Sequence, residues 1–454
     1  MNRFTSSIVL LLGIFFFCGC KKFLSEKSDK RLVIPTTLED LQALMELESY
    51  HNSYGVIVAE MAADNYYLTT EGFNSLSAQQ ARNLYSWNGG EIFDGTYNDW
   101  MYAYRTIYYS TTVLDLIQGI ERTSFNATQW DNIKGQALAA RAFRYLSLVT
   151  TWSKAYNPET ANADLGIPLR QTTDFSVPSV RVSVQETYDE IVKGLKEAIP
   201  LLPDVPLGNT RPGKPMAYAT LSRAYLNMHN YEVAGRYADS ALRLNNTLLD
   251  YNAVTSGIFP MAREHPEVIF QMYEAYYDQL LDLGFQRVDT LLYKTFEEND
   301  LRKELFFQEN EDGSHSFVGN YSGNSSTKFV GISNAELYLT RAECHARAGR
   351  LTEAMDDLNS LLRHRWDATK EFIPLTAISQ TEALETILLE RRKELMFRGL
   401  RWPDIKRLNQ EGANIILKRV VNGEEYILSP NDNRYALPIP EDIIELSGMP
   451  QNPQ

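Results

Sequence analysis

The chain has 454 residues and a formal net charge of −14 at pH 7. This acidic balance argues against nucleic acid or an anionic membrane face as a partner, because phosphate groups are bound by clustered cations. The length suffices for one large or two medium domains with a substantial core, and the 26 tyrosines, 20 phenylalanines and 6 tryptophans supply either that core or a surface that binds sugars or peptides.

The first residues have the pattern of a secretory signal. Arg3 precedes an apolar run from Ile8 to Phe17, and Gly19 and Cys20 follow. An ordinary cleaved signal and a transmembrane anchor are the weaker alternatives. The run is too short to cross a bilayer comfortably, since a transmembrane helix needs roughly 20 apolar residues. We therefore predict a lipoprotein signal peptide over residues 1–19, with Cys20 acylated more than once to give a stable anchor.

The segment after the signal predicts a tether and a fold without disulfides. Residues 20–33 are charged and poorly patterned, as in a lipidated linker. Cys18 leaves with the signal and Cys20 is acylated, so Cys344 remains alone and cannot form an internal disulfide.

Three amphipathic helices are predicted in the first half of the chain. The first begins at Thr37, a helix cap with Asp40 three positions later, and runs to Leu47. A helix from about Trp130 to Trp152 alternates small and large residues, which favours close helix packing. Between them, a helix from about Tyr97 to Ile120 carries a stripe that we interpret as core: Tyr97, Trp100, Tyr104, Ile107, Tyr108, Thr111 and Leu114.

A helical-repeat pattern occurs twice. Residues 217–244 and 336–362 place large and small side chains in the order of a tetratricopeptide unit, and the interval from Ser222 to Ala234 equals that from Ala342 to Ala354. A loop-rich insertion of about 250–331 separates the two units and is rich in Tyr, Phe, Asn and Gly. Connections this long are usually functional or disordered.

Catalytic, metal and cofactor motifs find no support. The stretch from Gly208 to Pro215 resembles a phosphate-binding loop, but Pro215 stands where Ser or Thr should bind magnesium. The six histidines are scattered without the spacing of a zinc site. The acidic pairs lie in charged helical stretches typical of solvated faces. We predict no enzyme activity, no metal and no cofactor.

The most individual segment is 390–408. It predicts a helix from Thr381 to Gly399, with Glu394 and Arg398 as a pair one turn apart, followed by a short helix opened by Pro403. Seven residues form the structural signature, and its polar members would hold the two helices at a fixed angle: Glu390, Arg391, Glu394, Gly399, Arg401, Trp402 and Asp404.

This segment closely resembles the signature of the SusD/RagB family of outer-membrane lipoproteins, departing mainly at Arg398, where the family usually has Glu. The start at Cys20 to Leu24, the helix from Ala137 to Val149, and the termini Tyr435 to Pro440 and Gln451 to Pro453 resemble the family in the same order.

The resemblance implies a mostly α-helical, tetratricopeptide-like scaffold with long loops and a few short strands. It implies a SusD-like N-terminal helical region over 34–210 and a SusD/RagB C-terminal region over 211–454. It also implies a lipid-anchored, surface-facing protein of the outer membrane that binds nutrient oligosaccharide and delivers it to a SusC-like TonB-dependent barrel transporter. Peptide binding, a non-binding assembly scaffold and a surface glycoside hydrolase remain as alternatives.

The resemblance carries over no ligand residues, so the candidates rest on physical arguments. We select aromatic residues outside the repeat registers and beside polar residues or glycines, with core packing as the competing interpretation for each: Tyr66, Tyr67, Trp87, Tyr276 and Tyr277.

Overall fold

The computed structural model describes residues 35–93, 95, 97–255, 261–262, 265–274, 279–324 and 327–454. The predicted signal peptide, the tether and Cys20 lie outside the described residues, as do Tyr276 and Tyr277.

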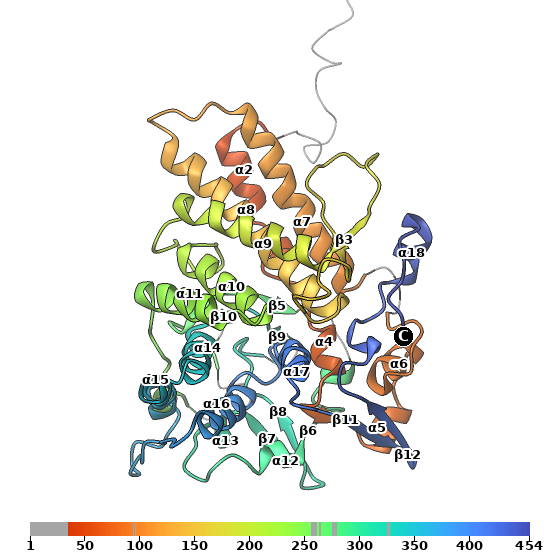
Figure 1. Cartoon of the computed structure of the whole chain (residues 1–454), viewed down its shortest axis with the longest axis vertical. Helices are drawn as coiled ribbons and strands as arrows, with labels where there is room; N and C mark the ends of the chain where they lie inside the picture. The colour runs from red at the N-terminus through yellow and green to blue at the C-terminus, as the bar shows by residue number, and fades with distance from the viewer. Residues whose placement is uncertain are drawn as a thin grey trace, which may run out of the picture.

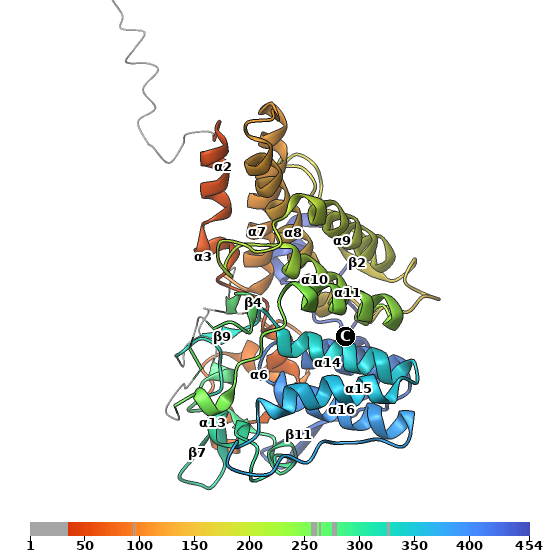
Figure 2. The same ribbon diagram turned by 90° about the vertical axis from the view of Figure 1, so that its left-hand side faces the viewer.

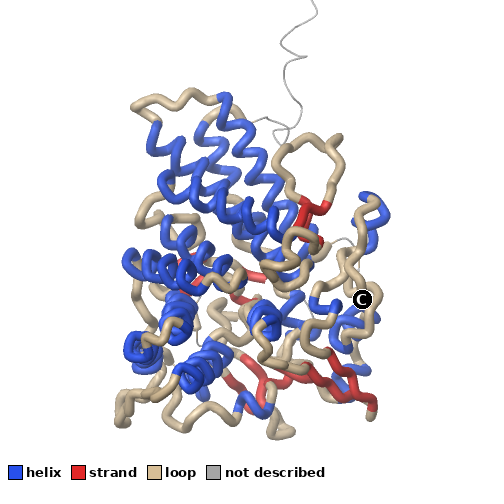
Figure 3. The backbone as a smooth tube through the Cα atoms, in the orientation of Figure 1, coloured by secondary structure: helices blue, strands red, loops and turns tan. Residues whose placement is uncertain are grey.

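Helices make up most of the described structure (Figures 1 and 3). The longer ones are α2 (Leu38–Met45), α6 (Gln79–Ser86), α7 (Asp99–Leu116), α8 (Ala127–Trp152), α9 (Val184–Ala198), α10 (Lys214–Asn227), α11 (Tyr231–Leu244), α14 (Asn334–Arg347), α15 (Leu351–Arg363), α16 (Gln380–Glu394), α17 (Arg401–Gln410) and α18 (Glu441–Ser447). Short helical turns are α3 (Glu48–His51), α4 (Val58–Ala62), α5 (Thr70–Asn74), α12 (Thr290–Tyr293) and α13 (Arg302–Leu305).

The strands are short and form antiparallel pairs. The pairs are β1 (Tyr66–Tyr67) with β6 (Arg287–Val288), β2 (Leu165–Pro168) with β3 (Arg181–Ser183), β4 (Val268–Phe270) with β10 (Ile332–Ser333), β5 (Tyr273–Glu274) with β9 (Lys328–Phe329), β7 (Phe307–Glu309) with β8 (His315–Phe317), and β11 (Leu417–Val421) with β12 (Glu424–Leu428). The predicted mostly helical fold with a few short strands is confirmed.

Local sequence signals start the predicted helices. Thr37 and Asp40 form a reciprocal capping box at the start of α2, as expected, and Ser183 with Glu186 forms another at α9. The helix predicted from Tyr97 begins two residues later, because Asn98 accepts a hydrogen bond from the backbone N–H of Met101 and caps α7.

The helices are stacked in layers from α7, α8 and α9 through α10 and α11 to α14, α15 and α16 (Figure 2). The two predicted repeat units are α10–α11 and α14–α15, and they are neighbours because α11 packs directly on α14. Gly235 permits this close approach: a Cβ at that position would lie 2.9 Å from Cβ of Cys344. The insertion between the units therefore leaves the stack unbroken.

The buried apolar side chains form one large core and smaller clusters. The large core runs through α7, α8, α9 and α10 into the insertion, and a separate cluster fills the space between α14, α15 and α16. Within the described part of the chain, no helix is both long enough and apolar enough to span a bilayer.

Candidate functional site

A groove of about 650 Å³ runs along one side of α7. Its volume lies within the range of small-molecule binding sites. Its three walls are one side of α7, the loop between β2 and β3, which projects beside α7 in Figure 1, and the chain around α18. The aromatic side chains of the lining are Trp100, Tyr104, Tyr108 and Phe175.

α7 has apolar residues on the side that faces the core and tyrosines at the edge of that side, where the groove lies. Trp100 and Ile107 face the core and are almost fully buried, with Trp100 packed edge-on against Trp152 at 5.2 Å between ring centroids. Tyr108 lies at the edge of that face and is 37% exposed, and Tyr97 at the start of the helix is 65% exposed. Tyrosine suits such an edge because its ring packs while its hydroxyl stays hydrated.

The loop wall is held against α7 by side-chain hydrogen bonds. The Tyr104 hydroxyl donates to the carbonyl of Pro168 at 2.8 Å, and the Thr111 hydroxyl donates to the carbonyl of Arg170 at 3.1 Å. Burial raises the pKa of Tyr104 well above its usual value, which keeps the phenol protonated as a donor. Asp115 accepts from both the backbone N–H and the hydroxyl of Thr173.

Arg170 closes the same loop on itself. Its guanidinium donates to the carbonyl of Val177 at 2.7 Å and to that of Asp174 at 2.9 Å. Phe175 at the loop tip is 80% exposed, and its ring stacks on that of Tyr108 with centroids 5.4 Å apart and planes 27° apart. The groove therefore offers a pair of aromatic faces whose positions are fixed before any ligand arrives.

The third wall is the turn that contains α18. Gln451 closes this turn, because its amide donates to the carbonyl of Ile439 and its carbonyl accepts from the N–H of the same residue. Arg181 of β3 donates to the carbonyl of Pro450 at 3.0 Å and so ties the turn to the loop wall. Leu446 faces solvent with 85% exposure, and Met449 is buried in the groove floor.

Two of the five predicted ligand residues are buried. Tyr66 is 3% exposed, and its hydroxyl donates to the carbonyl of Met61. Trp87 is 5% exposed, and its indole N–H donates to the carbonyl of Ala62. Both rings lie under the guanidinium of Arg419. In this conformation Tyr66 and Trp87 therefore pack inside the protein, which is the alternative that the sequence analysis gives for them.

Tyr67 is half-buried in β1, opposite Arg287 of β6, and burial raises its pKa. It is not among the groove residues, and neither are Tyr66 and Trp87. With Tyr276 and Tyr277 outside the described residues, the groove contains none of the ligand residues selected from the sequence.

The signature residues lie inside the protein and connect distant segments. Arg391 of α16 pairs with Asp404 of α17 at 2.7 Å, and Arg401 pairs with Asp64 at 2.7 Å. Glu394 receives hydrogen bonds from Arg302 and Arg365. The remaining members follow the same pattern: Glu390 pairs with Arg302 and Lys393, and the indole N–H of Trp402 donates to the carbonyl of Tyr435.

The end of α16 differs from the prediction. The helix stops at Glu394 rather than Gly399, and Phe397 and Gly399 then have positive φ angles of 59° and 73°. The predicted spacing of Glu394 and Arg398 one helical turn apart is therefore wrong. The guanidinium of Arg398 lies over the ring of Tyr321 at 3.9 Å, and Glu394 contributes to its raised pKa through charge alone.

Glu60 supports the turn that follows α16. Its carboxylate accepts from the backbone N–H groups of Phe397 and Gly399 at 3.2 and 3.0 Å and from the amide of Asn65 at 2.6 Å. Burial is complete and raises the pKa of Glu60 to about 7.

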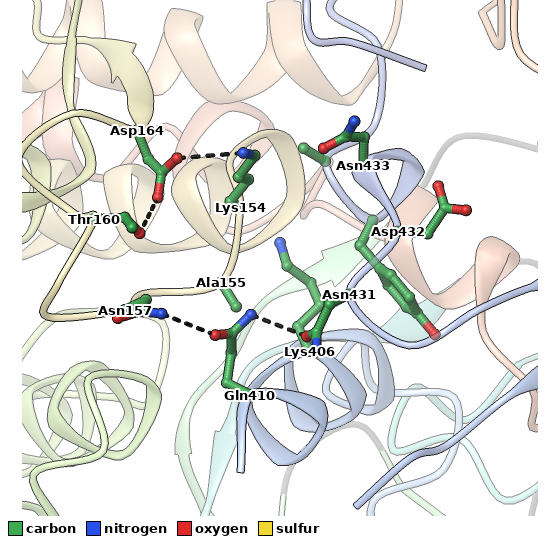
Figure 4. A pocket seen from close by; sticks show the side chains of 12 residues that line it. Lys154, Ala155, Asn157, Thr160, Asp164, Lys406, Gln410, Asn431, Asp432 and Asn433 are labelled. Carbon is green, nitrogen blue, oxygen red and sulfur yellow. Dashed lines mark hydrogen bonds and ion pairs between the residues drawn. The ribbon is translucent and has the colours of Figure 1, made fainter. Parts of the chain in front are cut away.

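A smaller polar pocket of about 190 Å³ lies between the end of α8 and the end of α17 (Figure 4). Lys406 donates to the carbonyls of Thr150 and Ser153 at 2.7 and 2.6 Å, and burial lowers its pKa to about 7. The surrounding side chains pair with one another, as Asp164 does with Lys154 and Thr160, and Gln410 with Asn157 and Asn431. These contacts provide hydrogen-bond partners for backbone carbonyls at the end of α8 and hold neighbouring segments of the chain together.

Part of the groove is formed by the stripe of α7 that the sequence predicts as core. The structure buries the Trp, Ile and Leu of this stripe, although Trp100 also lines the groove, while the tyrosines border the groove or face solvent. The useful signal is that the tyrosines occupy one edge of the stripe. Phe175 and the α18 turn had no comparable signal.

Among the described residues, no three or more His, Cys, Asp or Glu side chains are grouped so that they could hold a metal ion.

Comparisons with known proteins agree over most of the chain. A family model described as "Starch-binding associating with outer membrane" matches residues 22–226, and a model described as "SusD family" matches residues 306–454. A search of curated proteins finds no match.

Solved structures share the fold. A SusD superfamily protein from Bacteroides thetaiotaomicron has 21% sequence identity and a TM-score of 0.72, covering 92% of this chain and 100% of its own. A SusD-like carbohydrate binding protein from Bacteroides vulgatus has 22% identity and a TM-score of 0.65, covering 91% and 97%. A SusD superfamily protein from Bacteroides vulgatus has 20% identity and a TM-score of 0.73, covering 92% and 99%.

Proposed function

Since the chain belongs to the SusD/RagB family, we propose that it binds nutrient oligosaccharide in the groove along α7. The observation that carries this proposal is the fixed, solvent-facing pair of rings formed by Tyr108 and Phe175. Sugar rings have flat apolar faces bordered by hydroxyl groups, and an aromatic face with polar groups around it is complementary to both. The carbohydrate binding ascribed to one structural neighbour supports the same ligand class.

We further propose that the protein works as an outer-membrane lipoprotein, anchored through Cys20, which passes its ligand to a SusC-like TonB-dependent transporter. The family description, which names association with the outer membrane, supports this location. The role is one of binding without catalysis. Co-purification of a barrel partner from membranes tests the partnership, and the loss of lipid labelling in Cys20→Ala tests the anchor.

Calorimetry of the mature chain against a panel of oligosaccharides and peptides tests the binding. Saturable binding of an oligosaccharide is expected. Binding of peptides alone would indicate the peptide branch of the family, binding of nothing with an intact barrel partner would favour a scaffold, and release of reducing ends from a glycan would contradict the non-catalytic role.

Replacement of Tyr108 by Ala is expected to weaken oligosaccharide binding by about 1 kcal/mol or more, or about fivefold in Kd, because it removes one of the two stacking faces. Calorimetry of the variant with the best ligand of the panel measures the change. Tyr426→Ala is the matched control, because Tyr426 lies on β12 outside the groove and contacts Glu424. Equal affinities of Tyr108→Ala and the unaltered protein would remove the groove as the site.

A further inference from the structure

The charge of the groove is opposite to that of the whole chain. The chain has a formal net charge of −14, yet the residues that line the groove include Arg105 and Arg170 and no Asp or Glu. Four other cavities on the described residues each include at least one Asp or Glu in their lining. A basic groove on an acidic protein indicates a ligand that carries negative charge.

The positive charge of Arg170 is retained at the groove wall. The partners of its two terminal nitrogens are backbone carbonyls of the loop, which orient the guanidinium without neutralising it. Arg105, one turn of α7 away from Tyr108, lies with its guanidinium carbon 4.6 Å from the ring centroid of Tyr102. Arg105 and Arg170 therefore belong to two different walls of the groove, one to α7 and one to the loop.

The acidic residues of the loop region lie outside the groove lining. The hydroxyl of Ser176 and its backbone N–H, the latter at 2.8 Å, lower the pKa of Asp174, and the nearby charge of Arg170 adds to this effect. Asp115 is bound by Thr173 at the base of the loop. Neither residue is part of the groove lining.

From this arrangement we infer that the ligand of the groove is an acidic oligosaccharide, whose carboxylate or sulfate groups approach Arg105 and Arg170 while a sugar face stacks on Tyr108 and Phe175. Guanidinium groups bind carboxylate and sulfate oxygens with paired N–H donors. The inference rests on the proposed sugar-binding function of the same groove and names its substrate class. The groove walls are ring faces and helix sides, whereas extended peptides are commonly captured by an open strand edge, so a sugar fits better than an acidic peptide.

The central comparison is between an acidic oligosaccharide and its uncharged ester. Calorimetry is carried out on the mature chain with short oligogalacturonides, with their fully methyl-esterified forms, with the sulfated form of an otherwise neutral oligosaccharide and with an acidic peptide. The free acid is expected to bind at least about tenfold more tightly than the ester at low ionic strength, and this advantage is expected to shrink in about 0.5 M salt, where charges are screened beyond a few ångströms. Tight binding of the sulfated sugar in place of the galacturonide would identify sulfate as the source of the charge.

Variants of Arg105 separate charge from packing. Arg105→Gln is expected to weaken binding of the acid about fivefold and leave binding of the ester unchanged, whereas Arg105→Lys, which keeps the charge without the paired N–H donors, is expected to retain a preference for the acid over the ester. Equal affinity for acid and ester, or binding of a neutral oligosaccharide alone, would overturn the acidic-ligand inference and leave the sugar-binding proposal standing. Binding of no sugar, or of the acidic peptide alone, would overturn both.

Discussion

Replacement of Arg302 by Met is expected to lower the free energy of unfolding by about 3–5 kcal/mol. Arg302 is fully buried, and its guanidinium lies 2.7 Å from Asp300, 2.6 Å from Glu390 and 3.2 Å from Glu394. The variant removes the cation that all three carboxylates share and leaves only Lys393 and Arg365 to offset their buried charge. A buried charge that loses one of its partners is more costly than an exposed one, because water cannot replace the lost interaction.

Arg122→Met is the matched control. Arg122 also forms an ion pair, with Asp131 at 2.7 Å, but its side chain is 50% exposed. Removal of this pair is expected to change the free energy of unfolding by less than about 1 kcal/mol. Chemical denaturation of both variants under the same conditions gives the comparison, and similar stabilities of the two would contradict the importance of the buried network.

The Arg302 network explains why the signature segment has so many charged residues. Arg302 belongs to α13 in the insertion, Glu390 and Glu394 belong to α16, and Arg365 connects Glu394 to Glu267. The ion pairs hold the insertion against the repeat helices. The short strands of this region form few backbone hydrogen bonds that could do the same. The signature is therefore a junction within the fold, separate from the groove along α7.

The helices could be predicted from the sequence because their signals are local. The capping box joins Thr37 to Asp40, only three positions away, and the small residues of the repeat units follow one another at short intervals. The pairing of β1 with β6 could not be predicted, because Tyr66 and Val288 are brought together by packing between segments far apart in the chain.

The candidate site was harder to predict, because exposure depends on what covers a side chain. Trp87 has a polar neighbour in Asn88, which suggested the surface, but it ends α6 in a left-handed conformation with φ of 50° and turns its ring inward. Asn65 beside Tyr66 is itself buried against Glu60. Conversely, the stripe of α7 suggested core, and only the course of the loop after β2 determines which of its tyrosines face the groove.

Glu60 is expected to make the protein more stable as the pH falls from above 7 to about 4.5. Burial raises its pKa in the folded chain to about 7, against an ordinary value of 4.5. The folded state then binds the proton more tightly than the unfolded state, so this contribution to stability is complete below about pH 4.5 and is lost as the pH rises through about 7. The difference between the two ends is on the order of 3 kcal/mol.

Comparison with Glu60→Gln isolates this effect, because Gln keeps the shape and an acceptor oxygen but does not ionise in this range. The free energy of unfolding of the unaltered protein, minus that of the variant, is expected to fall between pH 4.5 and 7.5. Glu186→Gln provides a control of opposite sign: Glu186 is an exposed helix-cap residue whose pKa is lowered by its bonds to Ser183, so its contribution is lost as the pH falls. If the curves of the unaltered protein and Glu60→Gln run parallel with pH, Glu60 does not take up a proton on folding, and the bonds from Phe397, Gly399 and Asn65 outweigh the burial of its charge.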